Sequence, residues 1–312
     1  MTTTLESEFY WRWVIGLATF SGLGSLFIIV VILWKLRREF PSRLIMYLSI
    51  ADFGLSTICL GLCAYNLYND HLPEADSPMC QVQGVLTWFF MESSILWLDV
   101  ISIYSYRYVI SMYKITTRDE IITNMFCWGV PFITSTMPII TGTGESYGPM
   151  NGAVCSFAQD RKEAQLINIM TYYVPSLLII TSCYGSMMFH LYGFGRESAT
   201  NKDLAARARA KAIKKLFFYV LAYFIVWTPI SMSYIYEYVT GQWVSFLDEF
   251  IVDQLLHVQG IINWTLYGFF NMKILLVIRN GFMELKRTYS ETRIGDKTTK
   301  ASHNGQDTQD LP

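Results

Sequence analysis

Hydrophobic residues along the chain form seven runs of helical length, and polar segments separate each run from the next. A helix that crosses a membrane needs about 20 mostly apolar residues. Prolines such as Pro175 and Pro229 lie inside runs, where neighbouring groups can satisfy the freed carbonyls and kinks are expected. The pattern predicts spans near Trp13–Trp34, Leu44–Tyr68, Cys80–Tyr108, Ile121–Thr141, Leu166–Tyr192, Leu216–Tyr238 and Phe246–Phe270.

The third run, Cys80–Tyr108, carries Glu92 and Asp99 within an otherwise apolar sequence. Acidic side chains are costly in lipid and usually face a protein interior or a water-filled cavity. With Trp88 and Tyr106 they form a series spaced by four, seven and seven residues, which lies on one face of a helix. A polar stripe on an apolar helix has to be covered by other helices. We therefore expect a bundle organised around the third run.

Lys and Arg concentrate on one side of the predicted spans. The connections after the first, third and fifth runs and the C-terminal tail carry most of them, whereas the opposite side holds only Arg12, Arg161 and Lys162. Cytoplasmic loops carry this kind of excess. We therefore predict a multi-pass plasma-membrane protein with an extracellular N-terminus and a cytoplasmic C-terminus. The N-terminus lacks the basic region and cleavage site of a signal peptide, so the first run is expected to be an uncleaved anchor.

The composition is that of an all-α membrane protein. The chain is 52% hydrophobic and 16% charged, a balance typical of several spans. Its net charge of −1 indicates no class of partner, and no nucleic-acid partner is expected. The predicted organisation is an extracellular N-terminus at 1–12, a seven-transmembrane-helix bundle at 13–270, an amphipathic juxtamembrane helix at 271–289 and a disordered cytoplasmic tail at 290–312.

Two of the six cysteines fall on the predicted extracellular side. Cys80 lies at the outer end of the third run and Cys155 lies in the loop after the fourth, whereas the other four lie within spans. Disulfides form in oxidising compartments, and a cysteine inside a span is usually a small buried hydrophobe. We predict a Cys80–Cys155 bridge that holds the loop over the bundle; two free thiols are the alternative.

Three short motifs lie inside the spans: LSIAD at Leu48–Asp52, WTP at Trp227–Pro229 and NWTLY at Asn263–Tyr267. They resemble motifs of rhodopsin-like G-protein-coupled receptors. Leu48–Asp52 (LSIAD) is similar to their LxxAD pattern, and Trp227–Pro229 is similar to their W-x-P in span six. Asn263–Tyr267 (NWTLY) is similar to their NPxxY, with Trp264 in place of the proline. Plain packing or hydrogen bonding inside the bundle is the alternative for each motif. The resemblance implies an activation switch made of Asp52, Trp227, Pro229, Asn263 and Tyr267.

The chain resembles one subfamily more closely, the cyclic-AMP-receptor-like group named for slime-mould chemoattractant receptors. This resemblance covers the seven-span body and neither terminus, and it depends on the order and spacing of motifs that are individually weak. The motifs are Phe40–Leu44 (FPSRL), Cys80, Gln83–Gly84, Ser94–Trp97 (SILW), Trp128–Pro131 (WGVP), Gln259–Gly260, Asn263 and Tyr267–Phe269 (YGF).

The resemblance implies a heterotrimeric G protein as partner on the inner side. Span three ends in Tyr106–Tyr108 (YRY) and lacks the acid of the family's D-R-Y triplet. Arg107 is expected to contact the G protein or to lock spans three and six; a side chain that reaches the lipid headgroups is the alternative. The basic loop at 196–215 is expected to line the same cleft, although topology alone also explains its charge. Its expected contacts are Lys211, Lys214 and Lys215.

An extracellular small molecule is expected as the ligand, bound in the outer half of the bundle under the Cys155 loop. Cyclic AMP is one candidate, and Arg161 and Lys162 are the basic residues near that mouth besides Arg12. Packing or internal hydrogen bonding is the alternative for each candidate. The candidate ligand-binding residues are Thr87, Trp88, Glu92, Tyr234, Glu237, Asp253, His257, Arg161 and Lys162.

No catalysis, no metal site and no cofactor are expected, apart from a sodium ion near Asp52. Hydroxyls of the tail could accept phosphate and recruit kinase- or arrestin-like partners. A retinal protein is disfavoured, because no lysine lies between Phe246 and Phe270 to form a Schiff base. The remaining alternative is a transporter that moves protons or cations along Asp52, Glu92 and Asp99.

Overall fold

The computed structural model describes residues 4–36, 39–69, 74–113, 115–141, 146–150, 154–157, 162–197, 202–241 and 253–269, together with residues 276, 279 and 283. For part of these residues only the backbone is described. The predicted amphipathic helix at 271–289 and the predicted tail at 290–312 otherwise lie outside the described residues.

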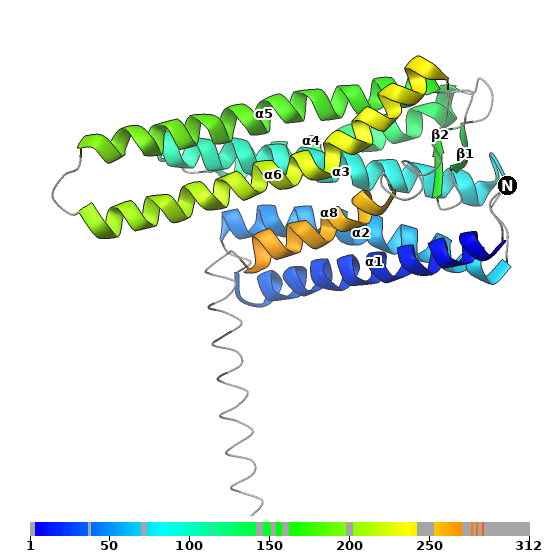
Figure 1. Ribbon diagram of the computed structural model, residues 1–312, viewed down its shortest axis with the longest axis horizontal. Helices are drawn as coiled ribbons and strands as arrows, with labels where there is room; N and C mark the ends of the chain where they lie inside the picture. Colours follow the sequence, from blue (N-terminus) through cyan, green and yellow to red (C-terminus); the bar gives the residue numbers. More distant parts are fainter. Residues whose placement is uncertain are drawn as a thin grey trace, which may run out of the picture.

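Long helices make up most of the described chain, and they lie side by side along the long axis of the molecule (Figure 1). Each predicted span overlaps one of them. The helices are α1 (Thr4–Val31), continued by a π-helical turn at Ile32–Leu36, α2 (Phe40–Asn69), α3 (Pro78–Ser111), α4 (Thr117–Thr141), α5 (Lys162–Glu197), α6 (Lys202–Thr240) and α8 (Asp253–Asn263), continued by a π-helical turn at Trp264–Phe269.

Four stretches of the described residues are long and apolar enough to cross a membrane, namely Phe9–Leu36, Phe40–Asn69, Pro78–Ser111 and Leu166–His190. The helices α4, α6 and α8 are shorter or less apolar over their described residues. The chain is therefore a mostly helical protein with several membrane-length helices.

Helix α3 is the centre of the bundle, as the polar stripe predicts. It packs against α2, α4 and α5, while α1 packs against α2 and α8, and α6 packs against α5 and α8. In α3, 78% of the membrane-length window is buried, against 28% to 44% in the other three stretches. Trp88, Glu92 and Asp99 are all buried. The polar face of the third run is thus covered by neighbouring helices.

The predicted loop at 196–215 is wrong over most of its length, because α5 continues to Glu197 and α6 begins at Lys202. The segment 202–215 reads KDLAARARAKAIKK, and Ala, Lys, Arg and Leu are strong helix formers. The charged residues keep the segment from forming an apolar run, but they do not disfavour a helix. Helix α1 likewise begins at Thr4, nine residues before the predicted span, because helical hydrogen bonding does not require apolar side chains.

A short antiparallel hairpin covers one end of the bundle (Figure 1). Its strands are β1 (Tyr147–Met150) and β2 (Val154–Phe157), with Tyr147 opposite Phe157 and Pro149 opposite Cys155. The sequence pattern does not predict this hairpin, because strands of four residues are too short to show alternation. The N-terminal residues of α1 lie at the same end, which we call the hairpin end.

Candidate functional site

A buried hydrogen-bonded network joins α2, α3 and α8 around Asp52. The Ser94 hydroxyl donates to Oδ1 of Asp52 at 2.8 Å, and the Asn263 amide donates to Oδ2 at 2.9 Å. Gln259 donates to the Ser94 hydroxyl at 2.9 Å. All four side chains are buried. Because each carboxylate oxygen receives a donor from a different helix, the network depends on how α3 and α8 sit against α2.

The network extends to α1 through close packing. The Ser56 hydroxyl lies 3.0 Å from that of Ser21, and it also donates to the backbone carbonyl of Asp52. A Cβ atom at Gly260 would lie 2.0 Å from the Ser21 hydroxyl oxygen. A side chain at position 260 would therefore force the Ser21 hydroxyl to move away from its place between α1 and α8. This contact gives a physical reason for the Gln259–Gly260 motif.

A small internal cavity lies beside the network, between α3, α5, α6 and α8. It has about 20 Å³ of room for water centres, enough for about one water molecule. Trp227, which is 1% exposed, lines it together with Asn263 and Gln259. Pro229 lies two residues further along α6. The cavity thus lies between the Trp227 ring and two members of the Asp52 network.

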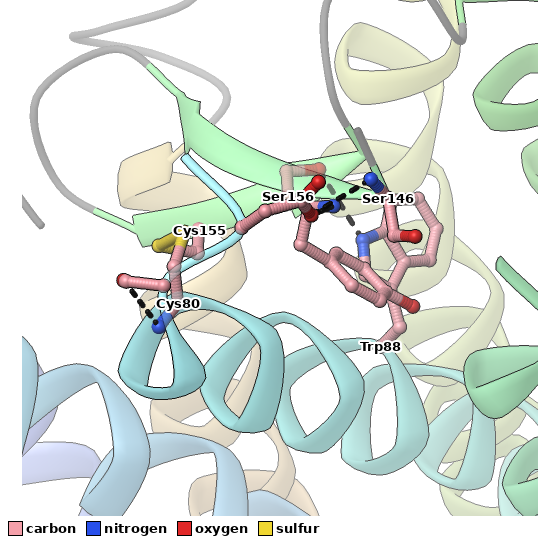
Figure 2. Close-up of a disulfide and its surroundings, with 8 residues drawn as sticks. Cys80, Trp88, Ser146, Cys155 and Ser156 are labelled. Atoms are coloured by element: carbon pink, nitrogen blue, oxygen red, sulfur yellow. Dashed lines mark hydrogen bonds between the residues drawn. A yellow bond between two sulfur atoms is a disulfide. The ribbon is translucent and has the colours of Figure 1, made fainter. Parts of the chain in front are cut away.

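The disulfide between Cys80 and Cys155 is present and confirms the predicted bridge (Figure 2). It ties β2 to the first turn of α3, where the Ser77 side chain caps the helix by accepting the Cys80 N–H. Next to it, the Trp88 indole N–H donates to the Ser156 hydroxyl at 3.2 Å. Cys80 and Cys155 are fully buried. The hairpin is thereby fixed onto the end of α3.

Further contacts hold β1 against the bundle. Asp76, with φ 54°, accepts the backbone N–H groups of Ser146 and Tyr147 at 2.8 and 3.2 Å. The Tyr147 hydroxyl donates to the Ser135 carbonyl, and burial, followed by the charge of Glu92, raises the pKa of Tyr147 above its ordinary value. A Cβ at Gly84 would lie 2.2 Å from the Tyr147 ring. Gly84 therefore makes room for Tyr147 against α3.

Glu92 and Asp99 face α4 and α5 rather than the Asp52 network. Glu92 accepts a short hydrogen bond from the Thr134 hydroxyl of α4. Asp99 accepts one from the Ser176 hydroxyl of α5 at 2.6 Å. One oxygen of each carboxylate has no hydrogen-bond partner among the described residues. The structure thus separates the buried acids into two groups, Asp52 toward α8 and the other two toward α4 and α5.

Two contacts organise the end opposite the hairpin. The Arg43 guanidinium of the FPSRL motif pairs with both carboxylate oxygens of Glu120, at 2.7 and 2.6 Å, and so joins α2 to α4. Tyr47 also donates to Glu120, at 3.1 Å. This bidentate geometry is the stronger form of ion pair. The pair between Arg43 and Glu120 is absent from the sequence-based candidates, because 77 residues separate its partners.

Arg107 lies at the same end, with its guanidinium 3.8 Å from the ring centroid of Tyr113. The Tyr113 hydroxyl donates to Asp119 at 2.9 Å, which raises the pKa of Tyr113. Asp119 also accepts the backbone N–H of Thr116, which lowers the pKa of Asp119 and caps α4. The described contact of Arg107 is therefore with the α3–α4 connection, and both of its expected roles stay predictions.

The candidate ligand residues are brought together only in part. Thr87, Trp88, Glu92 and His257 are buried, with Trp88 directly under β2. The remaining candidates have side chains that are not described, and Arg161 lies outside the described residues altogether. The positions known by their backbone alone are Lys162, Lys211, Lys214, Lys215, Tyr234, Glu237, Asp253 and Tyr267.

Sequence reasoning missed several residues of the site. Ser94 and Gln259 belong to the SILW and Gln259–Gly260 motifs, but a serine or glutamine in a span gives no signal of its partner. Asp76 and Tyr147 lie in segments that read as loop. One signal would have found Asp76: an aspartate, which adopts positive φ more readily than most residues, directly precedes the Ser-Pro sequence that starts α3.

Comparison with known proteins places the chain among membrane receptors. A model of the 7 transmembrane receptor family (rhodopsin family) matches residues 24–267, which include α2 to α6 and the whole Asp52 network. The chain belongs to this family.

Two proteins named as receptors or receptor-like are similar in sequence to most of this chain. Cyclic AMP receptor-like protein A of Dictyostelium discoideum is 25% identical over 260 residues, which cover 80% of this chain and 62% of the relative. The human 5-hydroxytryptamine receptor 4 is 24% identical over 295 residues, which cover 80% of this chain and 73% of the relative. The chain thus spans less than two thirds of the length of the Dictyostelium protein. Membership of the 7 transmembrane receptor family also makes the chain a multi-pass membrane protein.

Proposed function

We propose that this family member is a cell-surface receptor with seven membrane-spanning helices, which senses an extracellular small molecule and activates a heterotrimeric G protein. In this proposal the hairpin end is extracellular, the opposite end is cytoplasmic, and the protein catalyses no reaction. The observation that carries the proposal is the Asp52 network, which links α2, α3 and α8 directly beside the Trp227 cavity. Family membership and the disulfide at the hairpin end support it.

The proposed mechanism is a change between two arrangements of the bundle. A ligand shifts such an equilibrium only by its difference in affinity for the two arrangements. The Asp52 network stabilises the arrangement in which α8 lies against α2 and α3, because its bonds cross those helices. Movement of α6 at Pro229 would shift Trp227 within its cavity and disturb Asn263, which the same cavity contacts. The Asp52, Trp227, Pro229, Asn263 and Tyr267 positions would then act as one switch.

The ligand is proposed to act at the hairpin end. Trp88 lies under β2 and Thr87 is buried, so a ligand there would have to displace the hairpin or enter beside it. Cyclic AMP is the candidate suggested by the printed name of the Dictyostelium relative. Arg161 and Lys162 would be the cations that offset its phosphate. Tyr234, Glu237, Asp253 and His257 complete the proposed site.

The G protein is proposed to bind at the end opposite the hairpin. Lys211, Lys214 and Lys215 lie on α6, in the basic helical segment that precedes the apolar part of this helix. Arg107 lies at the same end, on α3. Kinase- or arrestin-like partners at the tail also stay proposals.

A sodium ion near Asp52 is part of the proposal. Sodium prefers oxygen ligands, and the oxygens of Asp52 and Ser94 lie in contact. Oε1 of Gln259 is buried without a hydrogen-bond partner among the described residues. These three residues would hold the ion, and its charge would replace the donors that now neutralise Asp52.

The test of the proposed function is nucleotide exchange on a panel of Gα subunits, with membranes that contain the protein and with matched membranes that lack it. Exchange above the matched membranes supports the receptor, and a further increase with cyclic AMP supports that ligand. Absence of exchange on every subunit, together with ligand-dependent cation or proton flux in proteoliposomes, would favour the transporter that uses Asp52, Glu92 and Asp99.

A further inference from the structure

Helices α1 and α8 meet along a seam in which each helix supplies one glycine. At the first contact the glycine belongs to α8, because a Cβ at Gly260 would meet the Ser21 hydroxyl of α1. One turn further along both helices it belongs to α1, because a Cβ at Gly24 would lie 2.3 to 2.5 Å from Cδ1, Nε1 and Cγ of Trp264. The Trp264 indole therefore lies directly against α1 at Gly24.

A second residue of α1 contacts the same indole. Phe20 lies one turn before Gly24, and its ring is edge-on to the Trp264 ring, with 5.7 Å between the centroids and 68° between the planes. Aromatic pairs prefer this edge-to-face arrangement. Gly24 and Phe20 thus form a notch on α1 that holds the Trp264 ring. The position of the ring is therefore set by α1 as well as by its own helix.

The helix geometry changes at this tryptophan. The chain is α-helical from Asp253 to Asn263 and π-helical from Trp264 to Phe269. Turns of π-helix are rare, and they occur often at functional sites. The NPxxY motif has proline at this position, which lacks a backbone N–H and kinks a helix, whereas Trp264 keeps its N–H and adds a large ring. The irregular turn of this chain thus begins at a residue that is anchored on α1.

The anchored turn lies next to the Asp52 network. Asn263, the residue before Trp264, donates to Oδ2 of Asp52 at 2.9 Å. A shift of the amide by on the order of 0.6 Å would lengthen this contact beyond a hydrogen bond. Gly260, three residues before Asn263, also faces Asp52, since a Cβ there would lie 3.6 Å from the Asp52 Cβ. Asn263 therefore lies between two contacts that fix α8 against α1.

We propose that Trp264 is a positioning residue of the switch: its indole, seated on Gly24 of α1, holds α8 at the rotation and height from which Asn263 reaches Asp52. Helix α1 is then part of the switch, and this consequence for signalling rests on the proposed function. A tryptophan that only fills space between α1 and α8 would stabilise the protein without acting through Asn263. Double variants separate these two roles.

Thermal unfolding of the full chain in nanodiscs tests the contact itself. Gly24→Ala and Gly16→Ala both add a methyl group to α1 and gain the same helix propensity, but a Cβ at Gly16 meets nothing within 4 Å. Gly24→Ala should lower the unfolding midpoint by several degrees, and Gly16→Ala should not lower it. Trp264→Phe leaves room for the added methyl and should recover most of the loss in the Gly24→Ala background. Equal midpoints for the two alanine variants would overturn the proposal.

An Asn263→Ala background tests whether Trp264 acts through Asn263. The midpoint loss from Gly24→Ala should fall to about half or less there, because part of that loss is the hydrogen bond of the missing amide. Gly84→Ala crowds a buried ring at the hairpin end and should cost the same in both backgrounds. An equal loss from Gly24→Ala in both backgrounds would make Trp264 a packing residue only and overturn the proposal. If Gly24→Ala does not fold, Trp264→Leu gives the same comparison without overpacking.

Nucleotide exchange on Gα subunits reports the consequence for signalling. Gly24→Ala should change exchange in the same direction as Asp52→Asn and should add nothing in the Asp52→Asn background, whereas Gly16→Ala should leave exchange unchanged. A further change from Gly24→Ala in that background would overturn the role of Trp264 in the switch. Because the unfolding measurements need no G protein, the positioning role can hold where exchange fails on every subunit, and the reverse also holds.

Discussion

At the scale of single residues, Asp52 shows how a buried acid is held by hydrogen-bond donors from two helices. Its two oxygens accept from Ser94 and Asn263, and Ser94 in turn accepts from Gln259. Asp99 accepts from Ser176 through one oxygen, and its other oxygen is buried without a hydrogen-bond partner among the described residues. The role of a buried acid in this bundle therefore depends on its hydrogen-bond donors as well as on its burial.

Asp52→Asn should leave surface expression intact and uncouple or bias signalling. An amide has a single acceptor oxygen, so the bonds donated by Ser94 and Asn263 cannot both be kept. With the amide oxygen toward Asn263, the Ser94 hydroxyl has to accept instead of donate and loses its carboxylate partner, which costs about 1–3 kcal/mol in that arrangement. The measurement is nucleotide exchange at matched surface expression. Thr57→Val is the control, because that exposed hydroxyl bonds only to its own helix. Unchanged exchange in Asp52→Asn would remove Asp52 from the switch.

Gly84→Ala should destabilise the hairpin end, although alanine is the better helix former. The added Cβ would lie 2.2 Å from the buried Tyr147 ring, and such overpacking costs about 1–3 kcal/mol. Gly61→Ala is the matched control, since nothing lies within 4 Å of its Cβ; it should stabilise α2 by up to about 1 kcal/mol. Thermal unfolding of the purified protein gives both values.

Thermal unfolding of Gly84→Ala in a Tyr147→Ala background tests whether the contact with the Tyr147 ring causes the loss of stability. Without the ring, the cost of Gly84→Ala should largely disappear, because the two residues are in contact and their effects do not add. An equal cost in both backgrounds would show that Gly84 acts through something other than Tyr147.

At the scale of elements, three kinds of contact hold the hairpin to the bundle. The disulfide, the Trp88–Ser156 hydrogen bond and the Asp76 contacts all hold it to α3 or to the preceding connection. At the other end, the Arg43–Glu120 pair joins α2 to α4. Contacts between elements thus hold both ends of the part of the bundle formed by α2, α3 and α4. The described part of α6 packs mainly against α5 and α8 instead, which suits an element that moves.

Cys80→Ser and Cys155→Ser should each reduce stability and surface trafficking. The bridge closes a segment of 75 residues, for which the chain-entropy model gives about 4 kcal/mol. The double variant should be no worse than either single one, because all three lack the same bond. Cys183→Ser is the control, since Cys183 is a free cysteine. Normal trafficking of both single variants would show that the bridge is dispensable.

At the scale of the whole molecule, the distribution of Lys and Arg predicts which end of the bundle meets the cytosol. The extended basic part of α6 lies at the end opposite the hairpin, and the disulfide lies at the hairpin end. Both features agree with an extracellular hairpin, because disulfides form in oxidising compartments and basic segments stay inside.

An epitope fused to the N-terminus should therefore be stained on intact cells, and one fused to the C-terminus only after permeabilisation. Each fusion serves as the control for the other. Staining of the C-terminal epitope on intact cells would reverse the predicted orientation and, with it, the assignment of the ligand and G-protein ends.

The sequence by itself determined the helices, the buried face of α3 and the disulfide. Each follows from a local rule: an apolar run needs no partner to be helical in lipid, a polar stripe at helical spacing must be covered, and only two cysteines fall on the predicted extracellular side. The same local reasoning placed Asp52 and Asn263 among the candidate switch residues through their motifs. It does not predict a helix over 202–215, because a charged segment between two apolar runs has the composition of a polar loop as well as that of a helix.

Only the tertiary structure decided which partner each buried group has. Ser94 reaches Asp52 across 42 residues of sequence, Asn263 across 211, and Arg43 reaches Glu120 across 77. Hydroxyl and amide donors occur throughout the spans, so nothing local distinguishes the one that will face an acid. The hairpin is decided in the same way, since strands of four residues form only once the segments around them are packed together. Contacts between distant residues depend on the packing of whole helices, and no single stretch of the chain determines that packing.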